Sequence, residues 1–161
     1  MVPTKSGNGY DVIVVGAGPA GLFASWLLCS QSGLKVLLLD KGRQPLKRKC
    51  PAKAAGECVH CRPCNILTGV GGAGLFSDGK LNFIHKLGKT DLTQFMDTVS
   101  AEALIRETED IFNHFGMDGQ VYPTDMAEAL AVRKRARTCG LDLLIIRQKH
   151  LGSDKLPGHI T

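Results

Sequence analysis

Three glycines and one acidic residue have the types and spacing needed to bind a dinucleotide. Gly16, Gly18 and Gly21 fit the pattern G-x-G-x-x-G, and Asp40 follows a little over twenty residues later. In such a site the first glycine permits a sharp turn, the second lets a pyrophosphate approach the backbone, and the third lets a helix close on a strand. The acidic side chain can accept hydrogen bonds from a ribose. The candidate cofactor-binding residues of this segment are Gly16, Gly18, Pro19, Ala20, Gly21, Asp40 and Lys41.

The sequence around these residues predicts the elements that position them. A β-branched run over residues 10–15 predicts a buried strand, and an apolar run over residues 22–29 predicts a helix that ends near Gly33. Residues 35–39 predict a second strand, with Asp40 at its tip. The helix N-terminus would present free N–H groups and the positive end of its dipole to phosphates. The alternative is a glycine turn in a βαβ unit that binds no ligand.

The glycine segment and the second strand together resemble a known flavoprotein unit. Gly-Ala-Gly-Pro-Ala-Gly at residues 16–21, followed by Leu-Leu-Leu-Asp-Lys-Gly at residues 37–42, resembles the N-terminal FAD-binding unit of the glutathione-reductase-like, two-dinucleotide-binding flavoproteins. The resemblance implies that this unit holds the ADP half of FAD. Because NAD sites use the same physics, the choice of FAD rests on the resemblance and not on the spacing.

Residues 69–82, with the sequence GVGGAGLFSDGKLN, form a second glycine-rich stretch. Its glycines let the backbone come close to another group, and its Ser, Asp and Lys supply polar groups, so the loop can close over a pyrophosphate or a flavin edge. The alternative is a surface loop with nothing bound. Together with Lys-Cys-Pro at residues 49–51, a run of cysteines and residues 147–154, this stretch resembles a group of uncharacterised FAD-dependent, NAD(FAD)-utilising dehydrogenases.

This second resemblance implies an FAD-dependent oxidoreductase of the dehydrogenase type, with NAD(P)H as a candidate electron donor or acceptor. In flavoenzymes the cofactor carries the chemistry, and the sequence indicates no catalytic residue of its own. By the same analogy the second glycine-rich stretch lies against the cofactor. The candidate residues there are Gly71, Gly72, Ala73, Gly74, Ser77, Asp78, Gly79 and Lys80.

Four cysteines form the pattern C-x7-C-x2-C-x2-C. Thiolates three residues apart can reach one metal ion or cluster, and the neighbouring Lys49 and Arg62 favour the thiolate form. The order departs from the usual 4Fe–4S pattern, because the Cys-Pro pair comes first rather than last. Three interpretations stay open: a zinc or iron–sulfur site, redox-active thiols, or loop cysteines without a ligand. No metal site is assigned, and the candidate ligands are Cys50, Cys58, Cys61 and Cys64.

The predicted fold class is α/β: a Rossmann-like FAD/NAD(P)-binding βαβ unit with an incomplete parallel sheet and two additional helices. We expect the helices over residues 90–115 and 125–139, and a strand over residues 141–146. Residues 1–89 are expected to hold the FAD-binding unit with its cysteine-rich excursion and second glycine-rich loop, and residues 90–161 a helical segment leading into a truncated second region. A doubly wound domain needs more parallel strands, so we expect the front part of a longer flavoprotein.

Composition and charge limit the classes of partner. The chain has 161 residues and a formal net charge of +5, enough length for one domain with a core. The apolar run over residues 12–29 contains three glycines and a proline, which suits a membrane span poorly. The basic run over residues 133–137 is interpreted as a solvated helix face. We therefore expect a cytoplasmic protein with reduced cysteines that acts on a small-molecule substrate and binds neither nucleic acid nor membrane.

Two other functions remain as alternatives. One is a cysteine-ligated metal or iron–sulfur module for electron transfer, in which the glycine unit serves only as scaffold. The other is a non-catalytic fragment of a flavoprotein. The sequence indicates neither the substrate, nor the electron acceptor, nor the oligomeric state.

Overall fold

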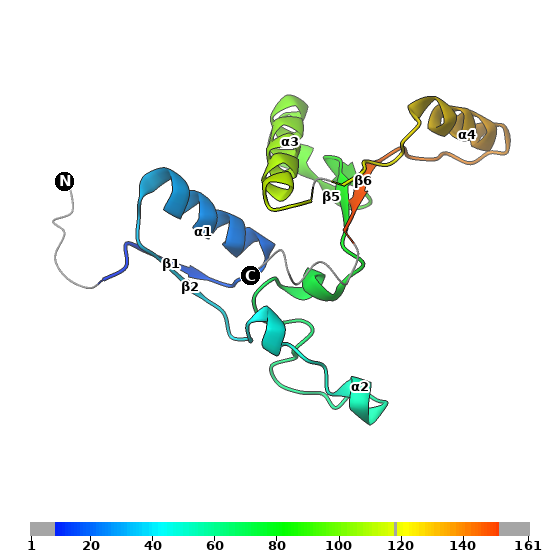
Figure 1. Cartoon of the computed structure of the whole chain (residues 1–161). Helices are drawn as coiled ribbons and strands as arrows, with labels where there is room; N and C mark the ends of the chain where they lie inside the picture. Colours follow the sequence, from blue (N-terminus) through cyan, green and yellow to red (C-terminus); the bar gives the residue numbers. More distant parts are fainter. Residues whose placement is uncertain (1–8, 118, 152–161) are drawn as a thin grey trace. The chain divides into compact units, whose positions relative to one another are not determined.

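The computed structural model describes residues 9–117 and 119–151, which form two compact units (Figure 1). The first unit runs to Ser77 and the second begins at Asp78. Each unit has its own sheet pairing and its own helices. The functional division expected from the sequence, after residue 89, stays a prediction.

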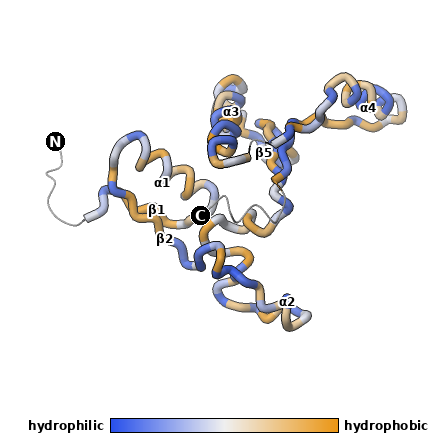
Figure 2. The backbone as a smooth tube through the Cα atoms, viewed as in Figure 1, coloured by the Kyte–Doolittle hydropathy of each residue, from blue (hydrophilic) through white to orange (hydrophobic). Residues whose placement is uncertain are grey.

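The first unit is built on a βαβ segment, as the sequence predicts, but its first strand is not buried as expected, because Ile13 and Val15 are exposed. The strands β1 (Val12–Val15) and β2 (Val36–Leu39) pair in parallel, residue by residue over their whole length. The helix α1 (Pro19–Ser32) connects them and ends at Gly33, whose left-handed backbone closes the helix. Hydrophobic residues follow one another along β1 (Figure 2). This small parallel sheet and its helix are a partial Rossmann-like unit of an α/β fold.

The rest of the first unit has little regular structure, in agreement with the loop expected after β2. A parallel bridge joins Arg43 to Gly69, and the Val70 N–H donates to the Arg43 carbonyl at 3.1 Å. This bridge closes the excursion between them at its base. Leu75 is 1% exposed and anchors the end of the second glycine-rich loop. The short helices of this region are η1 (Pro45–Lys47), α2 (Ala52–Ala55) and η2 (Ala73–Phe76).

The second unit combines two antiparallel strand pairs with the two additional helices of the prediction. β3 pairs with β6, and β4 pairs with β5. Its buried apolar side chains are Phe83, Ala101 and Met117. Over residues 9–117 and 119–151, no helix has the length and apolar character needed to span a bilayer. The elements are β3 (Lys80–Phe83), β4 (Lys86–Leu87), β5 (Thr90–Asp91), η3 (Leu92–Gln94), α3 (Thr98–His114), α4 (Met126–Thr138) and β6 (Arg147–His150).

The helix expected over residues 90–115 begins later than predicted. α3 starts at Thr98, where the Asp97 carboxylate caps it by accepting a hydrogen bond from the Ser100 N–H at 3.0 Å. Asp91 has the same capping chemistry, but it begins only the short helix η3. Asp91 and Asp97 therefore each cap a helix, and only the helix that follows Asp97 is long.

The strand expected over residues 141–146 was a wrong prediction. The strand β6 lies just after it, at Arg147–His150, and is polar. Lys149 in β6 is 5% exposed, and its ammonium lies 3.4 Å from the Glu109 carboxylate and donates to the Asn113 side chain. A strand whose buried position is occupied by an ion pair lacks the apolar alternation on which strand prediction depends.

Candidate nucleotide-binding site

The turn between β1 and α1 has a shape that only glycine allows at two positions. Gly16 has a φ of +106°, a conformation that side chains disfavour, and its N–H donates to the Leu39 carbonyl at 2.7 Å. A Cβ added at Gly21 would lie 1.8 Å from the Gly16 carbonyl oxygen. The first turn of α1 therefore rests directly on the backbone that leaves β1.

The N-terminus of α1 has the features of an anion-binding site. Its N-cap residue is Gly18, which makes no side-chain capping hydrogen bond, and no acidic residue lies in its first turn. Pro19 occupies the start of the helix, so the first-turn N–H groups come from Ala20 and Gly21. Such groups have no partner within the helix, and the helix dipole adds positive potential there. The arrangement suits a phosphate.

The carboxylate of Asp40 is held against the glycine turn. Its Oδ2 accepts a hydrogen bond from the Ala17 N–H at 2.9 Å, and its Oδ1 accepts one from the Gly42 N–H at 2.7 Å. These two amides lower the pKa of Asp40 against the effect of burial, with smaller contributions from the Gly69 amide and the Arg48 charge. The carboxylate is therefore ionised and fixed. With these three amides as donors, the carboxylate still has a lone pair for a ribose hydroxyl.

The second glycine-rich loop packs directly on the glycine turn. The Gly71 N–H donates to the Ala17 carbonyl at 2.8 Å. A Cβ added at Gly72 would lie 3.2 Å from Pro19 Cδ and 3.3 Å from Gly18 Cα, so the two backbones meet with little room for a side chain between them. Within the first unit, this loop and the N-terminus of α1 therefore lie side by side and form one candidate site.

The remaining predicted residues of this stretch divide between the two units. The Ser77 hydroxyl donates to the Gly74 carbonyl at 2.7 Å, which closes the end of η2. The side chains of Asp78 and Lys80 form an ion pair with each other at 3.3 Å. The first unit holds Ala73, Gly74 and Ser77, and the second holds Asp78, Gly79 and Lys80. Their contact with a cofactor, like that of the exposed Lys41, stays a prediction.

Arg48 is a residue of this region that the sequence did not mark. It lies between two lysines in a basic triplet, which is typical of an exposed loop, yet it is 3% exposed. Its guanidinium donates to main-chain carbonyls of residues 65–70, just before Gly71. Burial lowers the pKa of Arg48, and the charges of Asp40 and Cys64 oppose that shift.

The four candidate cysteines are all free thiols. In the part of the chain that the structure describes, no three His, Cys, Asp or Glu side chains gather in a way that could hold a metal ion. The N–H groups of Leu67 and Ile66 lower the pKa of Cys64, with smaller contributions from Cys61 and Arg48. A lowered thiol pKa favours the nucleophilic thiolate. Of the four candidate cysteines, Cys64 is therefore the one whose surroundings favour the thiolate form.

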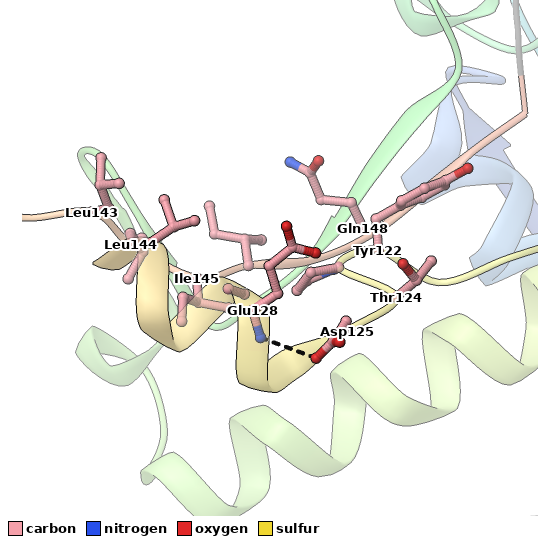
Figure 3. Close-up of a pocket in the computed structure, with 12 residues that line it drawn as sticks. Tyr122, Thr124, Asp125, Glu128, Leu143, Leu144, Ile145 and Gln148 are labelled. Atoms are coloured by element: carbon pink, nitrogen blue, oxygen red, sulfur yellow. Dashed lines mark hydrogen bonds between the residues drawn. The ribbon is translucent and has the colours of Figure 1, made fainter. Parts of the chain in front are cut away.

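A groove of about 530 Å³ lies in the second unit, between α4 and residues 143–146 (Figure 3). Leu143, Leu144 and Ile145 line one side of it. The Asp125 carboxylate on the other side caps α4 by accepting a hydrogen bond from the Glu128 N–H at 3.0 Å. The Asp125 carboxylate already accepts this capping hydrogen bond, and we assign no catalytic residue to the groove.

Comparison with known proteins bears on the first unit. The family model described as an NAD(P)-binding Rossmann-like domain matches residues 14–76. The chain is 45% identical over 49 residues to "Ribosomal RNA dihydrouridine synthase" of Escherichia coli (strain K12), covering 30% of this chain and 12% of that protein. It is 52% identical over 44 residues to "Uncharacterized protein in nifH2 5'region" of Methanosarcina barkeri, covering 27% of this chain and 22% of that protein. No solved structure matches.

The family match and the glycine-turn geometry define the class of this unit. Residues 14–76 are similar to NAD(P)-binding Rossmann-like domains, which supports a nucleotide-binding segment with a nicotinamide or flavin dinucleotide as its cofactor class. The chain spans less than a quarter of the length of either relative.

Proposed function

We propose that this chain supplies the ADP-binding part of the FAD site in a dehydrogenase-type oxidoreductase. The observation that carries the proposal is the packing of the second glycine-rich loop on the glycine turn, through the Gly71 N–H and the Ala17 carbonyl at 2.8 Å. This packing sets two glycine-bordered backbone segments beside the N-terminus of α1. The choice of FAD within the dinucleotide class rests on the sequence resemblance described above.

Each part of the site then has a binding role. The pyrophosphate would accept hydrogen bonds from the N–H groups of Ala20 and Gly21, and Gly18 would leave room for it. The fixed carboxylate of Asp40 would accept hydrogen bonds from a ribose hydroxyl. The bound flavin would supply hydride transfer at its N5 atom, while the protein binds and orients it. In this proposal residues 71–80 lie toward the flavin.

The remaining partners follow from the same proposal. NAD(P)H would serve as the electron donor or acceptor, and the second reactant would be a small molecule rather than a nucleic acid or a membrane. We place the protein in the cytoplasm, where its thiols stay reduced.

Nucleotide titration of the purified chain tests the proposal. We expect ADP to bind and FAD to bind poorly, because this unit holds only one end of FAD. Gly18→Val should weaken ADP binding at least about tenfold, because the new methyl groups occupy the space proposed for the pyrophosphate. Gly119→Val is the matched control, since a Cβ there meets nothing within 4 Å and the residue lies in the second unit. The measurement is isothermal titration calorimetry, with circular dichroism to show that each variant is folded.

The outcomes separate the alternatives. If the unaltered chain binds neither ADP nor FAD, or if Gly18→Val binds as tightly as the unaltered chain, the proposed site is wrong. If NAD+ binds more tightly than ADP, the site belongs to a nicotinamide cofactor, and the FAD assignment fails while the nucleotide site stands.

A further inference from the structure

We infer that Arg48 is a positioning residue, which fixes the second glycine-rich loop on the glycine turn so that the nucleotide site is formed. The inference rests on the proposed function for its binding readout. Arg48 would touch no cofactor atom; it would act through the backbone of residues 65–76.

The guanidinium of Arg48 is bound to the loop by an array of main-chain acceptors. It is 3% exposed, and four carbonyl groups on a single stretch of chain accept its hydrogen bonds. Those carbonyls belong to Asn65 (2.9 Å from Nε), Ile66 (2.7 Å from Nη2), Val70 (2.7 Å from Nη1) and Gly69 (3.5 Å from Nη1). The planar fork of an arginine can serve acceptors spread along a bend in this way.

The same side chain also fixes the far end of the loop. The Arg48 guanidinium carbon lies 4.8 Å from the centre of the Phe76 ring, a cation–π distance. Phe76 ends η2, the short helix that follows the glycines. One side chain therefore holds the chain on both sides of Gly71 and Gly72. These are the two residues whose backbone lies against Ala17, Gly18 and Pro19 of the glycine turn.

The close approach of backbones around Arg48 makes the arrangement specific to this residue. A Cβ at Gly69 would lie 2.9 Å from Arg48 Cδ, and one at Gly42 would lie 2.4 Å from the Gly69 N atom. The aliphatic part of the Arg48 side chain thus packs on glycine backbone, while its guanidinium donates hydrogen bonds to the carbonyls. A lysine would keep the charge and most of the stem, but its three donors on one atom cannot satisfy four separated carbonyls. The carbonyls left without a donor would be costly to bury, and this cost would favour loop conformations in which water hydrates them.

Arg48→Lys and Arg48→Met test this inference, with Lys47→Met as the matched control. Lys47 is the exposed neighbour in the same basic triplet. Two measurements are made on the whole chain: ADP affinity by calorimetry, and amide hydrogen exchange followed residue by residue. We expect both Arg48 variants to lose ADP affinity at least about tenfold. We also expect the Gly71 amide to lose protection while the amides of β1 and α1 keep theirs.

The pattern of exchange distinguishes positioning from general stability. If both Arg48 variants bind ADP like the unaltered chain, or keep the Gly71 amide protected, the inference is wrong. If the amides of β1 and α1 lose protection together with Gly71, Arg48 only stabilises the fold, and the inference is also wrong. If the unaltered chain fails to bind ADP, the proposed function falls, whereas the exchange measurement still decides whether Arg48 orders the loop.

Discussion

The closest contact of the glycine turn gives a stability prediction whose sign is decided by the structure. Gly21→Ala adds a Cβ that would lie 1.8 Å from the Gly16 carbonyl oxygen and 3.0 Å from its carbonyl carbon. Both atoms are backbone, so no side chain can rotate away to make room. The start of α1 must instead move from the turn by roughly an ångström, which is the kind of shift that overpacking forces on a well-packed region.

Two opposing effects set the magnitude. Overpacking costs about 1–3 kcal/mol, and a contact with fixed backbone belongs at the upper end of that range. Alanine in place of glycine in a helix returns up to about 1 kcal/mol through its higher helix propensity. We therefore expect Gly21→Ala to lower the free energy of unfolding by about 2 kcal/mol, although the same exchange at an open helical site would raise it.

Urea denaturation measures this change, followed by the fluorescence of Trp26, which lies on α1. The matched control is Gly18→Ala, where the backbone has a φ of −75° and the new Cβ meets only Gly72 Cα, at 4.0 Å. The control is expected to change stability by less than about 0.5 kcal/mol. A Gly21→Ala chain as stable as the original, or equal losses in both variants, would refute the reasoning.

Two further predictions concern charged groups. Glu109→Ala should destabilise the second unit by about 3 kcal/mol, because it leaves the buried Lys149 ammonium without its counterion. The control is Glu107→Ala, since Glu107 is exposed on the same helix. Equal unfolding midpoints of the two variants would contradict the prediction. Asp40 has a lowered pKa in the folded chain, so its stabilising effect is complete above the unfolded pKa of about 3.9 and is lost as the pH falls through the folded pKa. Asp40→Asn should abolish this contribution, and an unchanged pH dependence of urea unfolding between pH 7 and pH 3 would disprove it.

The sequence predicted the βαβ segment because its determinants are local. Gly16 and Gly21 are required by local backbone geometry, and the two strands are short continuous apolar runs. Arg48 could not be predicted in the same way, since its partners are main-chain carbonyls that any residue would supply. The buried Lys149 depends on Glu109, which lies far away in the sequence. Non-local pairing of this kind leaves no periodic signal.

Because of the bridge between Arg43 and Gly69, the length of the excursion has little influence on the geometry of the site. The bridge fixes both ends of the excursion with backbone atoms alone, so the loop between them is already closed at its base. Lengthening a closed loop adds little entropy cost, about 0.6 kcal/mol for each doubling. We therefore expect residues 50–63 to tolerate changes in length during evolution or engineering, while Arg48 and the glycines remain in place.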